Sequence, residues 1–201
     1  MINIFIILEV AMNLICIDAS IQSSGVSIYN NKTEQTILYS YSNKIKEELN
    51  FESGNFIVNI VPQTKESKKM DTFGRYVHVA ETIYNKIQPY LAQESELYME
   101  GYSYASRGMV FNIGEFGALL KLPFYKDGYQ FNFVEPASWK KLVTGKGNAN
   151  KTVVYDTMLS SELNVVLAEF ICRGHKYKKG TWIEDIVDVY SIQKFVLSKE
   201  G

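Results

Sequence analysis

Four acidic residues stand where their carboxylates could act together. Asp18 ends one apolar run, and Glu100 ends another. Asp185 and Asp188 are three residues apart, so they share one face of a helix. Carboxylate oxygens are ligands that Mg²⁺ and Mn²⁺ prefer, and two such ions can activate a water and stabilise the leaving oxygen of a phosphodiester. If the four acids converge, the chemistry they imply is metal-dependent phosphodiester hydrolysis.

Each acid also has a simpler explanation when it is considered alone. Asp18 can cap a turn, and Glu100 can be a solvated strand end. Asp185 lies near a helix start, where the helix dipole favours acidic side chains. Glu184 can take the place of Asp185 as a ligand, because Glu184 and Asp188 are four residues apart and can share a face. The combination of the acids therefore carries the prediction of a metal site.

The elements that must position these acids follow an α/β order. Strands are predicted over 13–18, 25–29, 36–41, 97–100 and 131–134. Helices are predicted over 70–91, 107–122, 136–143 and 182–198, with one more beginning at 151 under an Asn150 cap. Three antiparallel strands followed by alternating helices and strands predict an RNase H-like fold, with a mixed five-stranded sheet flanked by helices. In such a sheet the first and fourth strands end side by side, and the last helix can lay its acids across them.

The length of 201 residues predicts one domain. Residues 1–11 are apolar but precede the first good strand, so we expect an N-terminal extension followed by a domain over 12–201. The stretch 42–70 is polar and charge-mixed, with one possible strand at 56–61, and predicts an insertion.

Composition restricts the partners and the compartment. The formal net charge of −1 argues against a protein coated in positive charge. Cys16 and Cys172 lie in apolar surroundings without metal-ligand spacing, which predicts two buried free thiols, no zinc site and a cytoplasmic protein. The apolar start is too short to span a membrane and has no basic n-region, so no membrane association is expected.

One segment makes the sequence recognisable. Residues 133–151 contain Thr144-Gly-Lys-Gly-Asn-Ala-Asn-Lys151, and this segment closely resembles the corresponding region of RuvC Holliday-junction resolvases. Asp18, Glu100 and the Asp185-Ile-Val-Asp188 quartet match the family's acidic positions in the family's order. The resemblance covers nearly the whole chain from residue 13.

The resemblance implies a fold, a cofactor and a partner. It implies that Asp18, Glu100, Asp185 and Asp188 are catalytic and bind two Mg²⁺ or Mn²⁺ ions per active site. It also implies an RNase H-like fold and a homodimer that nicks opposing strands of four-way and other branched DNA. A two-fold dimer suits a junction that is itself pseudo-two-fold, because each subunit can deliver one active site.

The sequence also departs from the family pattern. The usual Asp-Pro-Gly after the first strand is Asp18-Ala-Ser20 here, and bulkier residues surround Asp185 and Asp188. Tyr102 and Tyr104 stand at other offsets than the aromatic residue that bacterial RuvC places after its catalytic Glu. Together with the long 42–70 stretch, these departures look more like the divergent RuvC-like resolvases of bacteriophages.

Basic residues gather in one part of the chain. Residues 135–180 hold eight Lys or Arg and four Asp or Glu, a local charge of +4. Lys146 and Lys151 flank a Gly/Asn-rich loop that leads into a helix start, a favourable place for DNA phosphates. Lys140 belongs to the same basic segment and is also expected to bind DNA. Tyr102 and Tyr104 are predicted to stack on unpaired bases, with core or interface packing as the alternative.

Three other functions stay open at this point. An RNase H-fold nuclease could act on RNA or an RNA–DNA hybrid, although the segment 144–151 disfavours it. A non-catalytic junction-binding module is disfavoured because all four acids are present. An actin-like or sugar-kinase ATPase is disfavoured because a second phosphate-loop strand is missing, so no nucleotide cofactor is expected.

Overall fold

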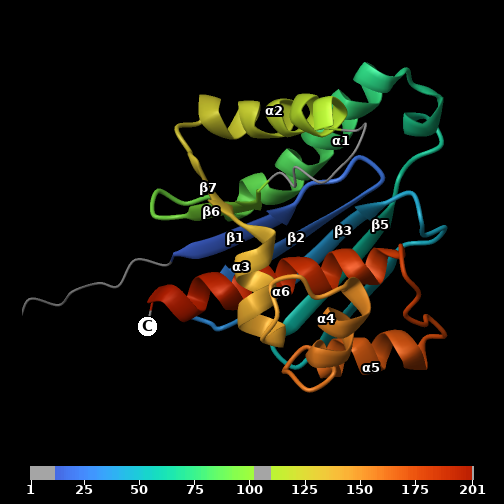
Figure 1. Ribbon diagram of the computed structural model, residues 1–201. Coiled ribbons are helices and arrows are strands. Elements are labelled where there is room, and N and C mark those ends of the chain that lie inside the picture. Colours follow the sequence, from blue (N-terminus) through green and yellow to red (C-terminus); the bar gives the residue numbers. More distant parts are fainter. Residues whose placement is uncertain (1–11, 102–109, 201) are drawn as a thin grey trace, which may run out of the picture.

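The computed structural model describes residues 12–101 and 110–200, which are built around one seven-stranded sheet (Figure 1). The strands lie in the order β4-β5-β3-β2-β1-β6-β7. Their bounds are β1 (Asn13–Asp18), β2 (Ser23–Asn30), β3 (Thr36–Ser42), β4 (Leu49–Ser53), β5 (Phe56–Pro62), β6 (Glu96–Glu100) and β7 (Phe131–Val134). The predicted α/β class is confirmed, and the first three strands are antiparallel as predicted.

The sheet has two strands more than the predicted five, because the 42–70 stretch supplies β4 and β5. Phe56, Val58 and Ile60 alternate along β5 and are buried, so the possible strand at 56–61 is a full member of the sheet. In β4 only Leu49 and Phe51 are apolar, and this pattern is too short to predict a strand. Gly54, with a φ of 58°, makes the turn that closes this hairpin.

Five strands end at one edge of the sheet. β6 and β7 run parallel to β1, and β5 runs parallel to β3. Because β2 is antiparallel to both β1 and β3, those two strands run in the same direction. The five strands that point the same way are therefore β1, β3, β5, β6 and β7. We call the place where they end the carboxyl edge, and it is marked by Asp18, Ser42, Pro62, Glu100 and Val134.

Helices cover both faces of the sheet in two layers (Figure 1). One layer is α1 (Thr72–Ile87) and α2 (Val110–Lys126), and the other is α3 (Pro136–Thr144), α4 (Lys151–Met158), α5 (Asn164–Cys172) and α6 (Trp182–Glu200). Two short 3₁₀ turns, η1 (Ser67–Lys69) and η2 (Gln88–Tyr90), flank α1. Each layer has its own apolar core, because alternate strand residues such as Leu14 and Ile15 face opposite layers.

Helix α2 runs through Pro123 to Lys126, whereas the sequence predicts an end at residue 122. Phe124 explains the extra turn. Its side chain is fully buried and packs edge-on against Tyr84 and Phe131, with ring centroids 5.0 and 5.2 Å away. This packing holds the last helical turn against the core despite the proline.

The two cysteines differ in exposure. Cys16 is buried in β1, as predicted, but Cys172 is exposed at the end of α5, so the prediction of two buried thiols is wrong for Cys172. The exposure follows from its place at the outer end of a short helix, beside the exposed Ile171. In the described part of the chain, no helix is long and apolar enough to cross a membrane.

Candidate active site

The ends of β1 and β6 bring the first two predicted acids together. These strands are parallel neighbours, and Ile17 pairs with Met99 in their register. Asp18 and Glu100 each follow by one residue, so both leave the sheet at the carboxyl edge. The charge of Asp18 also raises the pKa of Glu100, as expected of neighbouring carboxylates.

Helix α6 places the other two acids over the same edge, and a glycine permits its approach. A Cβ built on Gly25 would lie 2.6 Å from the backbone oxygen of Asp185, so any larger residue would push α6 away from β2. Gly25 pairs with Asp18 in the β1–β2 register. The contact between helix and strand therefore holds Asp185 near Asp18.

Two serines hold Asp185 in place. The Ser23 hydroxyl donates a hydrogen bond to Asp185 Oδ2, and the hydroxyl oxygens of Ser23 and Ser42 are 2.7 Å apart. Ser23, Ser42 and Asp185 are all buried. The sequence did not single out either serine, because Ser23 and Ser42 lie just outside the predicted strands 25–29 and 36–41, and Asp185 is 162 residues away from Ser23 in the chain.

Asp188 is the most deeply buried of the four acids. Its side chain is 1% exposed, and Oδ2 forms an ion pair with Lys151 Nζ at the start of α4. Its other oxygen, Oδ1, is buried and has no hydrogen-bond partner among the described residues. A buried carboxylate oxygen without a partner is costly, so this atom is suited to a further cation.

The surroundings raise the pKa values of the other three carboxyls. Burial raises the pKa of Asp18, and burial together with the charge of Asp18 raises the pKa of Glu100 to about 7 and that of Asp185 to about 8. The positive charge of Lys151 acts against the rise at all three acids. The charge of Asp18 therefore acts on both Glu100 and Asp185.

Glu184 also belongs to this region. It is buried, it accepts a hydrogen bond of 3.3 Å from the Tyr177 hydroxyl, and its charge raises the pKa of Asp18. The charge of Glu184 acts on Asp18, and the charge of Asp18 acts on Asp185, so both acids stay candidates for the ligand on the first turn of α6.

The acids are a suitable donor set for divalent cations, but they do not form a ready-made metal cluster. Within residues 12–101 and 110–200, no three acidic, histidine or cysteine side chains are grouped as metal ligands. Lys151 instead supplies positive charge to the site. The buried, partnerless oxygen of Asp188 and the raised pKa values show a site that lacks sufficient positive charge, and oxygen ligands of this kind fit Mg²⁺ or Mn²⁺.

Helix α3 contributes a further residue that sequence reasoning missed. Trp139 is fully buried, and its indole N–H donates a hydrogen bond of 3.0 Å to Glu100 Oε1. This bond opposes the rise in the Glu100 pKa, because it stabilises the charged carboxylate. Trp139 lies inside the recognised segment and could have been found as its one large aromatic residue after Phe133.

The loop between α3 and α4 explains the Thr-Gly-Lys-Gly pattern. Gly145 ends α3 in the left-handed conformation, with a φ of 76°. A Cβ on Gly147 would lie 2.9 Å from the Ala137 carbonyl oxygen, so the loop can pass α3 only with glycine there. Asn150 caps α4, accepting a hydrogen bond of 3.0 Å from the Val153 N–H, as predicted. The cap fixes the start of α4 and hence Lys151.

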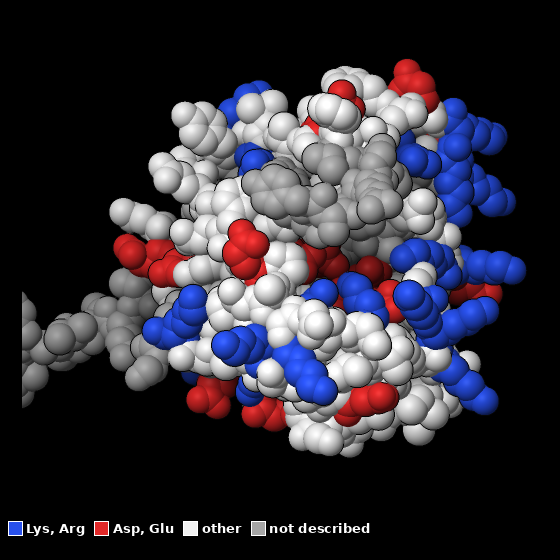
Figure 2. All heavy atoms as spheres, viewed as in Figure 1, with Lys and Arg blue, Asp and Glu red and all other residues white. Residues whose placement is uncertain are grey.

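The predicted DNA-binding residues fall into three groups. The charges of Lys140 and Lys151 reach Asp18 and Glu100, so both lysines lie beside the carboxylates. Lys146 is exposed on the loop. Tyr102 and Tyr104 lie outside the described residues. Figure 2 shows acidic side chains recessed between the two helical layers, with Lys and Arg side chains around them.

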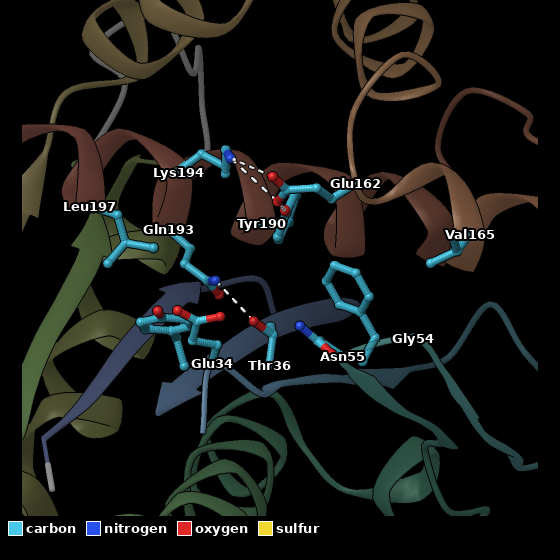
Figure 3. Close-up of a pocket in the computed structure, with 12 residues that line it drawn as sticks. Glu34, Thr36, Gly54, Asn55, Glu162, Val165, Tyr190, Gln193, Lys194 and Leu197 are labelled. Carbon is cyan, nitrogen blue, oxygen red and sulfur yellow. Dashed lines mark hydrogen bonds and ion pairs between the residues drawn. The ribbon is translucent and has the colours of Figure 1, made fainter. Parts of the chain in front are cut away.

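A large cavity lies elsewhere, beside the C-terminal half of α6. It measures about 660 Å³, and none of the four predicted acids lines it. Figure 3 shows Gln193 reaching Thr36, with a hydrogen bond of 3.0 Å, and Lys194 reaching Glu162. Cavity size is therefore a poor guide to the active site of this protein. The neighbouring carboxylates with raised pKa values mark the candidate site instead.

Comparison with known proteins supports the fold. No protein family and no curated protein matches the sequence. Among solved structures, Thermus thermophilus RuvC matches with a TM-score of 0.56 and 12% identity, over 94% of this chain and 97% of RuvC. The chain has the RuvC fold. The same T. thermophilus protein in complex with a Holliday junction substrate matches with a TM-score of 0.51 and 10% identity, over 94% of this chain and 96% of that one.

The raised pKa values predict how the metal-free protein responds to pH. Glu100 and Asp185 have pKa values of about 7 and about 8, against ordinary values of 4.5 and 3.8. The folded state binds more protons than the unfolded state between these values, so the free energy of unfolding falls as pH rises from about 4 to about 8.

Thermal unfolding in a chelator measures this effect. The wild type is expected to lose stability from about pH 5 to about pH 8, Asp185→Asn is expected to lose less, and added Mg²⁺ is expected to stabilise the wild type most at the higher pH. Equal slopes for the wild type and Asp185→Asn would contradict the assignment of a buried, repelled carboxylate.

Proposed function

We propose that this chain is a divalent-metal-dependent endonuclease that resolves Holliday junctions and other branched DNA. The observation that carries the proposal is geometric: Asp18 and Glu100 end neighbouring parallel strands at the carboxyl edge of a RuvC fold, and α6 packs Asp185 and the Lys151-paired Asp188 over that edge. The resemblance of residues 133–151 to the RuvC family supports branched DNA as the substrate class. At 12% identity the structural similarity supports the fold, and the activity is inferred from the site.

Asp18, Glu100, Asp185 and Asp188 would hold two Mg²⁺ or Mn²⁺ ions, with Glu184 as an alternative to Asp185. When bound, such ions activate a water and stabilise the leaving oxygen of a phosphodiester, leaving 5′-phosphate and 3′-hydroxyl ends. The residues around them prepare this arrangement.

The neighbouring side chains hold the acids in fixed orientations. Trp139 holds Glu100 through its indole N–H, and Ser23 holds Asp185 through its hydroxyl. Lys151 neutralises Asp188. When divalent ions supply that charge, the Lys151 ammonium can turn to a DNA phosphate, and Lys140 stands beside it for the same purpose.

A homodimer fits a substrate with two cleavage points, and the surface of α2 and β7 supplies a suitable patch. Leu122, Tyr125 and Phe133 are 46%, 71% and 50% exposed. They surround a cavity of about 370 Å³. We call these three residues the α2–β7 patch. Contiguous exposed apolar residues commonly mark a protein interface, and β7 lies at the edge of the sheet, where a second copy can approach.

Asp188→Asn tests the catalytic assignment. Removing this charge is expected to reduce cleavage of a four-way junction in Mg²⁺ or Mn²⁺ by more than about 100-fold, since even outer-shell partners of metal ligands are worth about 10- to 100-fold. Junction binding is expected to persist. Asp156→Asn is the matched control, because Asp156 is exposed on α4.

The cleavage assay should include a junction, a flap, a plain duplex and an RNA–DNA hybrid, with products mapped on every strand. Cleavage by Asp188→Asn at the wild-type rate would contradict the active-site assignment. Cleavage of the hybrid but not of the junction would replace the proposal with an RNase H-type activity.

Tyr125→Lys tests the dimer. A charge in the α2–β7 patch is expected to convert the dimer to a monomer in sedimentation experiments, and to convert paired nicks into single nicks. Phe73→Lys is the control, because Phe73 is 61% exposed on α1 and does not belong to the patch. A wild type that sediments as a monomer at assay concentration, with or without junction DNA, would contradict the proposed dimer.

A further inference from the structure

The stretch that adds two strands to the sheet also adds lysines to the carboxyl edge. Ser42 and Pro62 are paired neighbours in the β3–β5 register, and both strands end there. The segments that follow them carry exposed lysines close to these ends. We call these residues the insertion lysines: Lys44, Lys65, Lys68 and Lys69.

Hydrogen bonds attach these segments to the turn that follows Asp18. The Gln63 N–H donates to the Ser42 carbonyl at 2.8 Å, and its side-chain amide donates to the Ile21 carbonyl at 2.8 Å. The Asn43 N–H donates to the Gln22 carbonyl at 2.9 Å. Gln63 is only 4% exposed. The inserted segments are therefore fixed to the same turn as the candidate catalytic carboxylate.

The charge of one insertion lysine reaches the candidate active site. The positive charge of Lys44 lowers the pKa of both Asp18 and Asp185, against the effect of burial. Lys44 follows β3, whereas Lys140 and Lys151 belong to α3 and α4, so the carboxylates have lysines from two separate parts of the fold.

Acidic neighbours limit the extent of the basic surface. Glu66 is the one acid within residues 63–69, which also hold three lysines. Lys46, Glu47 and Glu48 line a separate cavity with Arg173, so they belong to a different surface. Figure 2 shows Lys and Arg side chains continuing from the recessed acids along the side of the molecule where, in Figure 1, β3, β5 and η1 lie.

We propose that the insertion lysines bind the phosphate backbone of a DNA arm that leaves the candidate active site along this side. The inference rests on the proposed function and gives the inserted segments a role in it. Lysines on fixed segments bind phosphates as point charges without reading sequence, and duplex DNA offers a dense row of phosphates. Lys44 would contact phosphates near the cleaved bond, and Lys65, Lys68 and Lys69 would contact phosphates farther along the arm.

Salt-dependent binding of a four-way junction tests this proposal. Removing one lysine that binds a phosphate reduces the slope of log Kd against log salt by about 1, so Lys68→Ala with Lys69→Ala is expected to reduce it by about 2. We expect Kd to rise about tenfold at 0.1 M salt. The matched control is Lys32→Ala with Lys199→Ala, because Lys32 and Lys199 are exposed, Lys32 lies in the turn between β2 and β3, and Lys199 lies at the far end of α6.

Two further readouts separate the outcomes. The cleavage rate at saturating protein should match the wild type, because Lys44, Lys140 and Lys151 are the described lysines whose charges act on Asp18, Glu100 or Asp185, and Lys68 and Lys69 are not among them. The binding defect should vanish on junctions with trimmed arms. A wild-type slope for Lys68→Ala with Lys69→Ala, in a protein that binds and cuts junctions, would overturn this inference alone. Failure of the wild type to bind or cut junctions would overturn the proposed function, and this inference with it.

Discussion

Repulsion among carboxylates at one buried edge is the constraint that the candidate site must satisfy. Burial raises the pKa of both Glu100 and Asp185, and the negative charge of Asp18 adds to the rise. Asp188 leaves one oxygen without a partner among the described residues. Such an arrangement costs free energy unless cations offset it. Among the described residues, Lys151 forms an ion pair with Asp188, and divalent ions at the same acids would add the charge that is missing.

The fold brings the acids together through a few close contacts. The parallel pairing of β1 with β6 sets Asp18 beside Glu100. Gly25 lets the backbone of α6 approach β2, and this approach sets Asp185 over the sheet. The position of Lys151 depends on the glycine-containing loop after α3 and on α4, the helix that begins where this loop ends. Substitutions at such supporting positions would therefore move the acids without touching them.

The sequence predicted the α/β class, the first three strands and the Asn150 cap, because each has a local pattern. Strand β4 was missed because its pairing with β5, rather than its composition, makes it a strand. The extension of α2 past Pro123 depends on the burial of Phe124, which is a tertiary contact. Ser23 and Trp139 were missed for the same reason, since their partners lie far away in the chain.

We propose that cations other than Lys151 neutralise these carboxylates in the active protein. A crystal of the wild type grown with Mn²⁺, measured for anomalous scattering, tests it most directly. We expect manganese peaks in contact with Asp18 and Asp188, and a Lys151 ammonium that has left Asp188. Peaks found only elsewhere, with the ion pair between Lys151 and Asp188 intact at saturating Mn²⁺, would contradict it.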